Sequence, residues 1–236
     1  MKILALESTA KVASCALCDD EKLLGVTQID AGLTQSEILL PMAEDLLRAA
    51  HLSFADIGLY ACTVGPGSFT GVRIGVATVK GLAFGKNVPC VAVSALESLA
   101  QNLFPLDGIY AACMDARRGQ VYNALFRAEG GKLVRLCEDR ALSVRELLNE
   151  LAAAYAGEVI RFVGDGYDAV REEADKTGFP YQPTPLALRA QSAASCAAVA
   201  YRKYLAGETV SDRQLAPTYL RLPQAERERL ERQQNA

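Results

Sequence analysis

One plan of secondary structure occurs twice along the 236 residues, and this repeat constrains the fold more than any single motif. Each copy begins with an apolar strand that ends in an acidic residue, Glu7 in the first copy and Asp115 in the second. Two more strands, a helix and a further apolar strand follow. Each copy then closes on a glycine-rich turn, Gly65-Pro66-Gly67 or Gly164-Asp165-Gly166. Strands and helices in this order predict an α/β protein with two similar lobes.

A duplicated βββαβ plan is that of the actin-like fold (the ASKHA fold, shared by sugar kinases and Hsp70). The pattern restarts near Pro105, so we expect an N-terminal lobe over residues 1–104 and a C-terminal lobe over residues 105–206. Residues 207–236 are expected to return to the N-terminal lobe and to end in a tail of alternating glutamates and arginines. This likeness concerns architecture and does not settle function.

The glycine-rich turn of the first copy leads directly into a helix. Gly65 and Gly67 permit backbone angles that a side chain would forbid, and N–H groups at the head of a helix can bind an anion. The spacing fits neither a P-loop nor a dinucleotide fingerprint. Phosphate binding and a purely structural turn therefore both stay open. A degenerate nucleotide site would consist of Glu7, Gly65, Gly67, Ser68 and Asp115.

The helix after this turn has small residues along one face. Gly71, Gly75 and Thr78 are neighbours at helical spacing, although a glycine inside a helix costs about 1 kcal/mol relative to alanine. Such a face allows another backbone to approach closely, as in membrane helix pairs. Two explanations stay open: close packing inside the same lobe, and a surface shaped to meet another protein.

Composition and charge argue against several classes of function. A net charge of −3 argues against binding nucleic acid by charge alone. No apolar run approaches the roughly 18 residues of a membrane span, and the N-terminus lacks a signal-peptide pattern, so we expect a cytoplasmic protein. A single histidine, His51, excludes metal chemistry built on a histidine pair. The seven scattered cysteines, including Cys15 and Cys18, predict buried thiols. We therefore expect neither a metal nor a cofactor.

Four motifs, in order along nearly the whole chain, together resemble one family. They span residues 3–9, residues 65–81 with the core Gly-Pro-Gly-Ser-Phe-Thr-Gly-Val-Arg-Ile-Gly, residues 115–122 with Asp-Ala-Arg-Arg and Val-Tyr, and residues 217–221. The sequence is similar to the TsaB family, also called YeaZ. Two positions depart from the usual family pattern: Glu7-Ser8-Thr9 replaces Asp-Thr-Ser, and Gln35 replaces the histidine of His-Ser-Glu.

The resemblance implies a bacterial subunit needed to make N6-threonylcarbamoyladenosine at position 37 of tRNAs that read codons beginning with adenine. In this family the transfer is carried out by a larger paralogue, TsaD, with help from an ATPase, TsaE. TsaB-like chains support TsaD, form a homodimer when alone, and meet tRNA only through the complex. The resemblance therefore implies an accessory subunit without catalytic residues of its own.

The resemblance also places the contact with TsaD on helices of the N-terminal lobe. The expected partner or dimer interface consists of Glu37 and Leu40 on the helix over residues 34–50, and of Gly71, Val72, Arg73, Gly75, Val76, Thr78, Val79 and Leu82 on the glycine-bearing helix. On this hypothesis, Gly75→Leu abolishes association and leaves the fold intact.

An ATP-dependent small-molecule kinase of the actin-like class is the alternative, with Glu7 and Asp115 as carboxylates that place a metal. Against it, the bulky Arg117 and Arg118 that follow Asp115 should block close backbone approach to phosphates. For these two arginines, a local contact with RNA and ordinary salt bridges both stay open, with salt bridges favoured.

Overall fold

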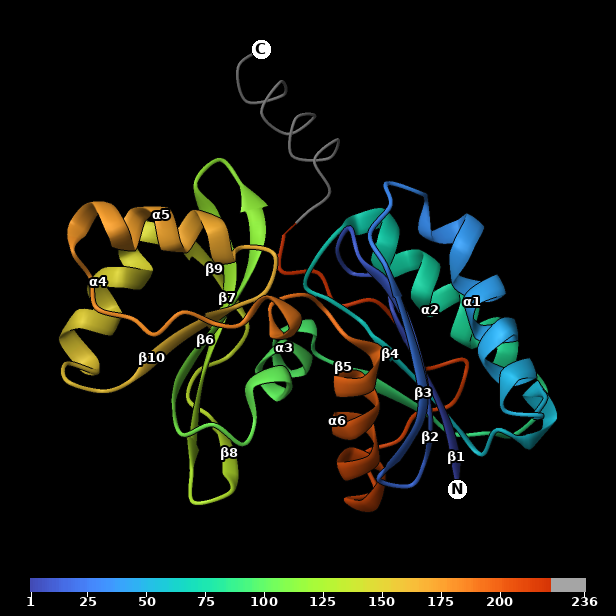
Figure 1. Ribbon diagram of the computed structural model, residues 1–236. Helices are drawn as coiled ribbons and strands as arrows, with labels where there is room; N and C mark the ends of the chain where they lie inside the picture. Colours follow the sequence, from blue (N-terminus) through green and yellow to red (C-terminus); the bar gives the residue numbers. More distant parts are fainter. Residues whose placement is uncertain (222–236) are drawn as a thin grey trace, which may run out of the picture.

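The computed structural model describes residues 1–221 and consists of two sheets, each flanked by helices (Figure 1). The first sheet has the order β3-β2-β1-β4-β5, and β1 pairs antiparallel with β2 and parallel with β4. Its strands are β1 (Lys2–Glu7), β2 (Ala13–Asp19), β3 (Lys22–Ile29), β4 (Leu59–Thr63) and β5 (Cys90–Val93). A short 3-10 turn, η1 (Phe54–Asp56), precedes β4. This is the arrangement that the first copy of the repeat predicts.

Two helices cover one face of this sheet and lie side by side, α1 (Gln35–Ala49) and α2 (Phe69–Ala83) (Figure 1). Their starts follow from local hydrogen bonding. Thr34 and Glu37 form a capping box in which the Thr34 N–H donates to the Glu37 carboxylate at 3.1 Å. In α2 the Ser68 hydroxyl accepts the Gly71 N–H. The core beneath both helices contains side chains such as Leu39 and Val76.

The second sheet repeats the plan with one change, because its third strand is broken. Its order is β10-β6-β7-β8, and β9 also pairs with β7. The strands are β6 (Gly108–Arg117), β7 (Gln120–Glu129), β8 (Lys132–Arg135), β9 (Arg140–Ser143) and β10 (Ile160–Val163). Helices α4 (Val144–Ala154) and α5 (Tyr167–Thr177) cover one face, and the 3-10 turn η2 (Leu186–Leu188) follows α5.

The remaining two helices are exchanged between the lobes. Helix α3 (Ala95–Leu103) packs on the second sheet, against residues such as Tyr110 and Phe126, although it precedes that sheet in sequence. Helix α6 (Ala193–Leu205) packs on the first sheet, against Ile3 and Ala61 among others. The two helices also contact each other. A lobe boundary at residue 104 therefore assigns α3 to the N-terminal lobe, although it covers the second sheet. A boundary at residue 206 likewise assigns α6 to the C-terminal lobe, although it covers the first sheet.

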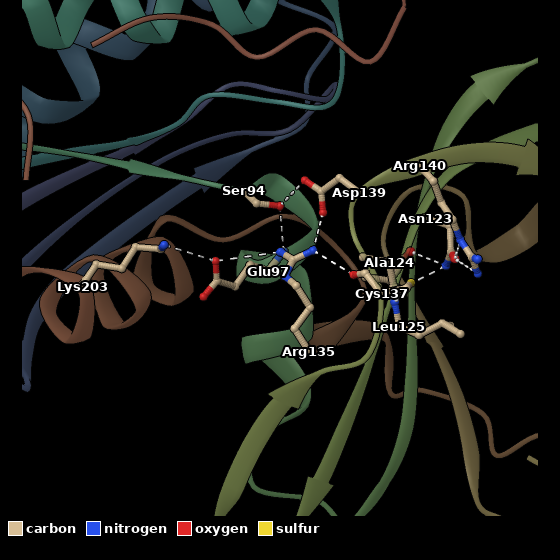
Figure 2. Close-up of polar contacts among 11 residues, drawn as sticks. Ser94, Glu97, Asn123, Ala124, Leu125, Arg135, Cys137, Asp139, Arg140 and Lys203 are labelled. Carbon is tan, nitrogen blue, oxygen red and sulfur yellow. Dashed lines mark hydrogen bonds and ion pairs between the residues drawn. The ribbon is translucent and has the colours of Figure 1, made fainter. Parts of the chain in front are cut away.

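A polar network joins this exchanged pair to the second sheet (Figure 2). Glu97 of α3 lies 3.9 Å from both Arg135 of β8 and Lys203 of α6. Arg135 also pairs with Asp139 at 2.6 Å, and the Ser94 hydroxyl donates to the same Asp139 carboxylate. The network lies where α3, α6 and the second sheet come together, so it fixes the helices against the C-terminal lobe.

The segment after α6 returns to the N-terminal lobe and then crosses to the other one. Val210 bridges to Cys90, and Leu215 is buried in the core under α1 and α2. The Thr218 N–H donates to the Val64 carbonyl at 2.7 Å, and Arg221 donates to Gln120 of β7 at 2.7 Å. Residues 215–221 thus form a strap between the lobes. The charged tail expected beyond it lies outside the described residues.

Candidate functional site

The small-residue face of α2 points into the protein. A Cβ on Gly71 would overlap the Ser8 carbonyl oxygen, and a Cβ on Gly75 would overlap the Ser8 hydroxyl. That hydroxyl donates to the Gly71 carbonyl at 2.8 Å. Both glycines are buried, and they allow α2 to lie directly against the turn between β1 and β2. The close approach that these glycines permit is therefore made by the chain itself.

Half of the expected interface residues are consequently unable to reach a partner. Val72, Val76 and Val79 are 3% exposed or less and lie in the core with Gly71 and Gly75 beside them. The expectation that these five residues form a protein-binding surface is wrong, because the apolar period of α2 turns them toward the first sheet. It follows that Gly75→Leu would disrupt the lobe itself.

The opposite side of α2 is open. Arg73, Ala77 and Gly81 are exposed, and a Cβ on Gly81 would meet no atom of residues 1–221 within 4 Å beyond the backbone of its own helix. Thr78 and Leu82 are half-buried at its edges. Beyond the end of the helix, Phe84 is 72% exposed. The sequence analysis did not include Ala77, Gly81 and Phe84 in the interface. The signal for the first two was Arg73: a charged residue indicates the solvent side of a helix, and Ala77 and Gly81 follow it at steps of four residues on that side.

Helix α1 continues this open surface. Leu40 is 39% exposed, and Glu37 is exposed while it caps the helix. We call the exposed side of the two helices the α1–α2 face and define it by Glu37, Leu40, Arg73, Ala77, Thr78, Gly81, Leu82 and Phe84. It combines apolar side chains with a helical glycine, Gly81, for which no contact within residues 1–221 gives a reason.

The glycine turn before α2 is filled by the chain. Gly65 and Gly67 have φ values of +120° and +156°, which explains the choice of glycine at both positions. A Cβ on Gly65 would overlap the Thr218 carbonyl oxygen, and one on Gly67 would overlap that of Thr9. The Ser68 N–H donates to this Thr9 oxygen at 2.7 Å. The space over the turn, where a phosphate would approach, is therefore occupied by backbone.

Glu7, the first carboxylate of the degenerate nucleotide site, is fully buried. Its Oε1 accepts the Thr9 N–H at 2.7 Å and the Thr9 hydroxyl at 2.5 Å. Its Oε2 and the buried Thr63 hydroxyl have no partner among the described residues. Burial raises the pKa of Glu7, against the opposing effect of the Thr9 hydrogen bonds. The Glu7 side chain is therefore held inside the lobe by its own turn, where burial disfavours its charged form.

Asp115, the second carboxylate, has a different environment. It is exposed at the end of β6, and its Oδ1 accepts the backbone N–H of Arg117 at 2.7 Å. The side chains of Glu7 and Asp115 are thus held by their own turns, one buried and one exposed. This arrangement lacks the matched, open pair of carboxylates that a metal-placing kinase site requires.

Further expectations concern residues away from the glycine turn and its two carboxylates. Cys15 and Cys18 lie on opposite faces of β2, one in each adjoining core, and His51 is exposed just after α1. Within residues 1–221, no group of His, Cys, Asp and Glu could hold a metal ion. No helix of this part of the chain has the length and apolar character to cross a membrane.

Comparison with known proteins gives three concordant results. A family model described as "TsaD: tRNA N6-adenosine threonylcarbamoyltransferase" matches residues 22–229. The "tRNA threonylcarbamoyladenosine biosynthesis protein TsaB" of Escherichia coli K12 is 31% identical over 94% of this chain and 95% of its own length. The crystal structure "YeaZ from Pseudomonas aeruginosa" superposes with a TM-score of 0.78 at 28% identity, over 93% of this chain and 99% of the other.

A more distant structure supports the fold alone. Component A of (R)-2-hydroxyglutaryl-CoA dehydratase from Acidaminococcus fermentans superposes with a TM-score of 0.50 at 13% identity. The two sheets with their exchanged helices define a protein of the actin-like class, and its glycine turn is closed by its own backbone. Within that class the chain belongs to the TsaB family, whose curated members are named for the biosynthesis of threonylcarbamoyladenosine in tRNA.

Proposed function

We propose that this chain is a non-catalytic subunit in the formation of N6-threonylcarbamoyladenosine in tRNA, and that it binds a TsaD-like transferase through the α1–α2 face. Family membership gives the pathway. The closed glycine turn and the separated carboxylates support the absence of catalysis by this subunit. A TsaE-like ATPase as a further partner, homodimerisation of the free chain, contact with tRNA through the complex, and action in the cytoplasm belong to the same proposal.

One observation supports the α1–α2 face most directly: the glycine at position 81. A glycine inside a helix costs about 1 kcal/mol relative to alanine, and Gly71 and Gly75 offset this cost by packing on Ser8. Gly81 has no such contact. With the exposed Ala77 one turn before it and the exposed Phe84 three residues after it, Gly81 leaves room for another backbone beside apolar side chains.

The interface is tested by placing a charge at its centre. Ala77→Glu puts an unpaired carboxylate where the partner packs, and such a charge costs about 2–5 kcal/mol in an interface. We expect association with the transferase subunit to weaken at least about thirtyfold, measured by calorimetric titration and by co-elution. The fold should remain, because Ala77 is exposed and glutamate is a good helix former.

The matched control is Ala152→Glu, at an exposed alanine inside α4 on the other lobe. This variant should bind the transferase as the wild type does. Equal affinity of the folded Ala77→Glu and Ala152→Glu variants would rule out the α1–α2 face as the contact.

A further inference from the structure

The hairpin tip between β6 and β7 has a feature that binding through the α1–α2 face leaves unexplained. Arg117 pairs with Gln120, and Arg118 and Gly119 form the loop between them. Arg117 and Arg118 have φ values of +67° and +56°. Side chains disfavour this region, and glycine and asparagine are the usual residues in such turns. Two consecutive arginines there are strained, and strain of this kind is concentrated at functional sites.

Within residues 1–221, neither arginine makes a side-chain interaction that would offset the strain. The bond from Arg117 to Asp115 uses the backbone N–H, which any residue other than proline supplies. Both side chains are exposed. Within residues 1–221, every ion pair of an arginine involves other positions, so the salt bridges favoured from the sequence are not formed with this part of the chain.

A third guanidinium lies beside the tip. The strap brings Arg221 to β7, where it donates to Gln120, the residue paired with Arg117, and lies 5.7 Å from the centre of the Tyr122 ring. Like charges repel, so three neighbouring guanidinium groups lower the stability of the free chain, and stability alone does not explain their placement. Three guanidiniums without ion-pair partners in the described chain lie at this tip with one exposed carboxylate, Asp115, so positive charges outnumber negative ones there on a protein whose net charge is −3.

We propose that the tip formed by Arg117 and Arg118, together with Arg221, binds the phosphate backbone of the tRNA while the chain is part of its complex. This inference rests on the proposed function. Guanidinium groups suit phosphate oxygens by charge and geometry. The short hairpin fixes the backbone of the tip, so on binding mainly the arginine side chains lose freedom. Contacts of this kind position an RNA and carry no sequence information.

The test replaces the arginines by the residues that the turn prefers. Arg117→Gly with Arg118→Asn leaves an Asn-Gly loop, so the melting temperature should rise by about 2–4 °C. In the complex with the transferase, the affinity for tRNA should fall about tenfold near physiological salt. The slope of log K against log salt should become shallower by about 1–2, as expected for one or two lost phosphate contacts.

Two variants serve as controls. Arg117→Lys with Arg118→Lys keeps both charges and should retain the salt slope. Arg202→Gln removes an exposed arginine of α6, distant from the tip, and should leave tRNA binding unchanged. A more stable Gly-Asn variant that binds tRNA with unchanged affinity and slope would overturn the proposal.

Loss of transferase association in that variant would also overturn it, and would assign the tip to an acidic protein surface. If the wild-type chain itself fails to co-elute with the transferase, the proposed function has failed separately. A titration of the free chain with tRNA at low salt then distinguishes the two failures: binding that depends on the two arginines would show that the tip binds RNA without the transferase, and binding that does not depend on them would overturn this inference as well.

Discussion

Gly71→Ala should destabilise the protein by about 3 kcal/mol or more, at or above the upper end of the usual cost of overpacking a core. The added methyl group would overlap the Ser8 carbonyl oxygen, which is backbone and cannot rotate away. Relief would require α2 to move from the turn between β1 and β2, and the Ser8 hydroxyl would then lose its bond to the Gly71 carbonyl. Urea unfolding monitored by circular dichroism measures the change in the free energy of unfolding.

The same glycine-to-alanine substitution ten residues further along α2 should change the stability in the opposite direction. Gly81→Ala adds a methyl group where no atom lies within 4 Å, so the gain in helix propensity should stabilise the free chain by about 1 kcal/mol. The pair of variants compares one substitution in one helix at a packed and at an open position. Equal effects of the two changes on stability would contradict the assignment of α2 faces.

Glu7→Gln should stabilise the protein at neutral and alkaline pH by about 1–3 kcal/mol, the cost of leaving a buried polar group unsatisfied. An amide keeps the acceptor for Thr9 and supplies a donor for Thr63, whose hydroxyl lacks a partner among the described residues. Leu6 of β1 pairs with Cys62 of β4, so the next residues, Glu7 and Thr63, are neighbours as well. Their side chains therefore lie on the same face of the sheet.

The pH dependence gives this prediction its sign. Burial raises the pKa of Glu7 in the folded state above the value near 4.3 of an unfolded glutamate. The folded state therefore binds the Glu7 proton more tightly than the unfolded state does. The free energy of unfolding is greatest below the unfolded-state pKa of Glu7, and it falls as the pH rises from there through the folded-state pKa. The stability advantage of the glutamine variant should widen from about pH 4 upward. A constant difference across this range would mean that the pKa of Glu7 is the same in the folded and unfolded states, which would contradict the prediction.

Glu7→Gln also separates a structural role from a catalytic one. If Glu7 placed a metal in a kinase-like site, the loss of its charge would remove activity of the assembled complex. Because the Glu7 carboxyl is fully buried within the lobe, we expect the complex with the glutamine variant to keep its tRNA-modifying activity.

The repeat of strands and helices was readable from the sequence because local signals agree with the fold. The Thr-x-x-Glu pattern at Thr34 and the Ser-x-x-Glu pattern at Ser143 are local signals of a helix start, and α1 and α4 begin there. The third strand of the second copy is split into β8 and β9, because the chain between them leaves the sheet, where Asp139 pairs with Arg135. Such a break depends on a tertiary contact, and no local pattern encodes it.

The exchange of α3 and α6 was not predictable for a similar reason. Both helices are apolar on a face that fits either sheet, and their assignment depends on which sheet lies within reach. The orientation of α2 was predictable in part. Val72, Val76 and Val79 share one side of the helix, so Gly71 and Gly75 beside them belong to the buried half. The contact of these glycines with Ser8, however, is a long-range contact that appears only in the structure.

The central claim is that the α1–α2 face touches the transferase, and a photo-crosslinking residue at position 77 tests it directly. The same residue at position 152, on an exposed part of α4, is the reference. In the purified complex we expect crosslinks to the transferase from position 77 and none from position 152. A co-eluting complex that crosslinks from position 152 and stays uncrosslinked from position 77 would contradict the account.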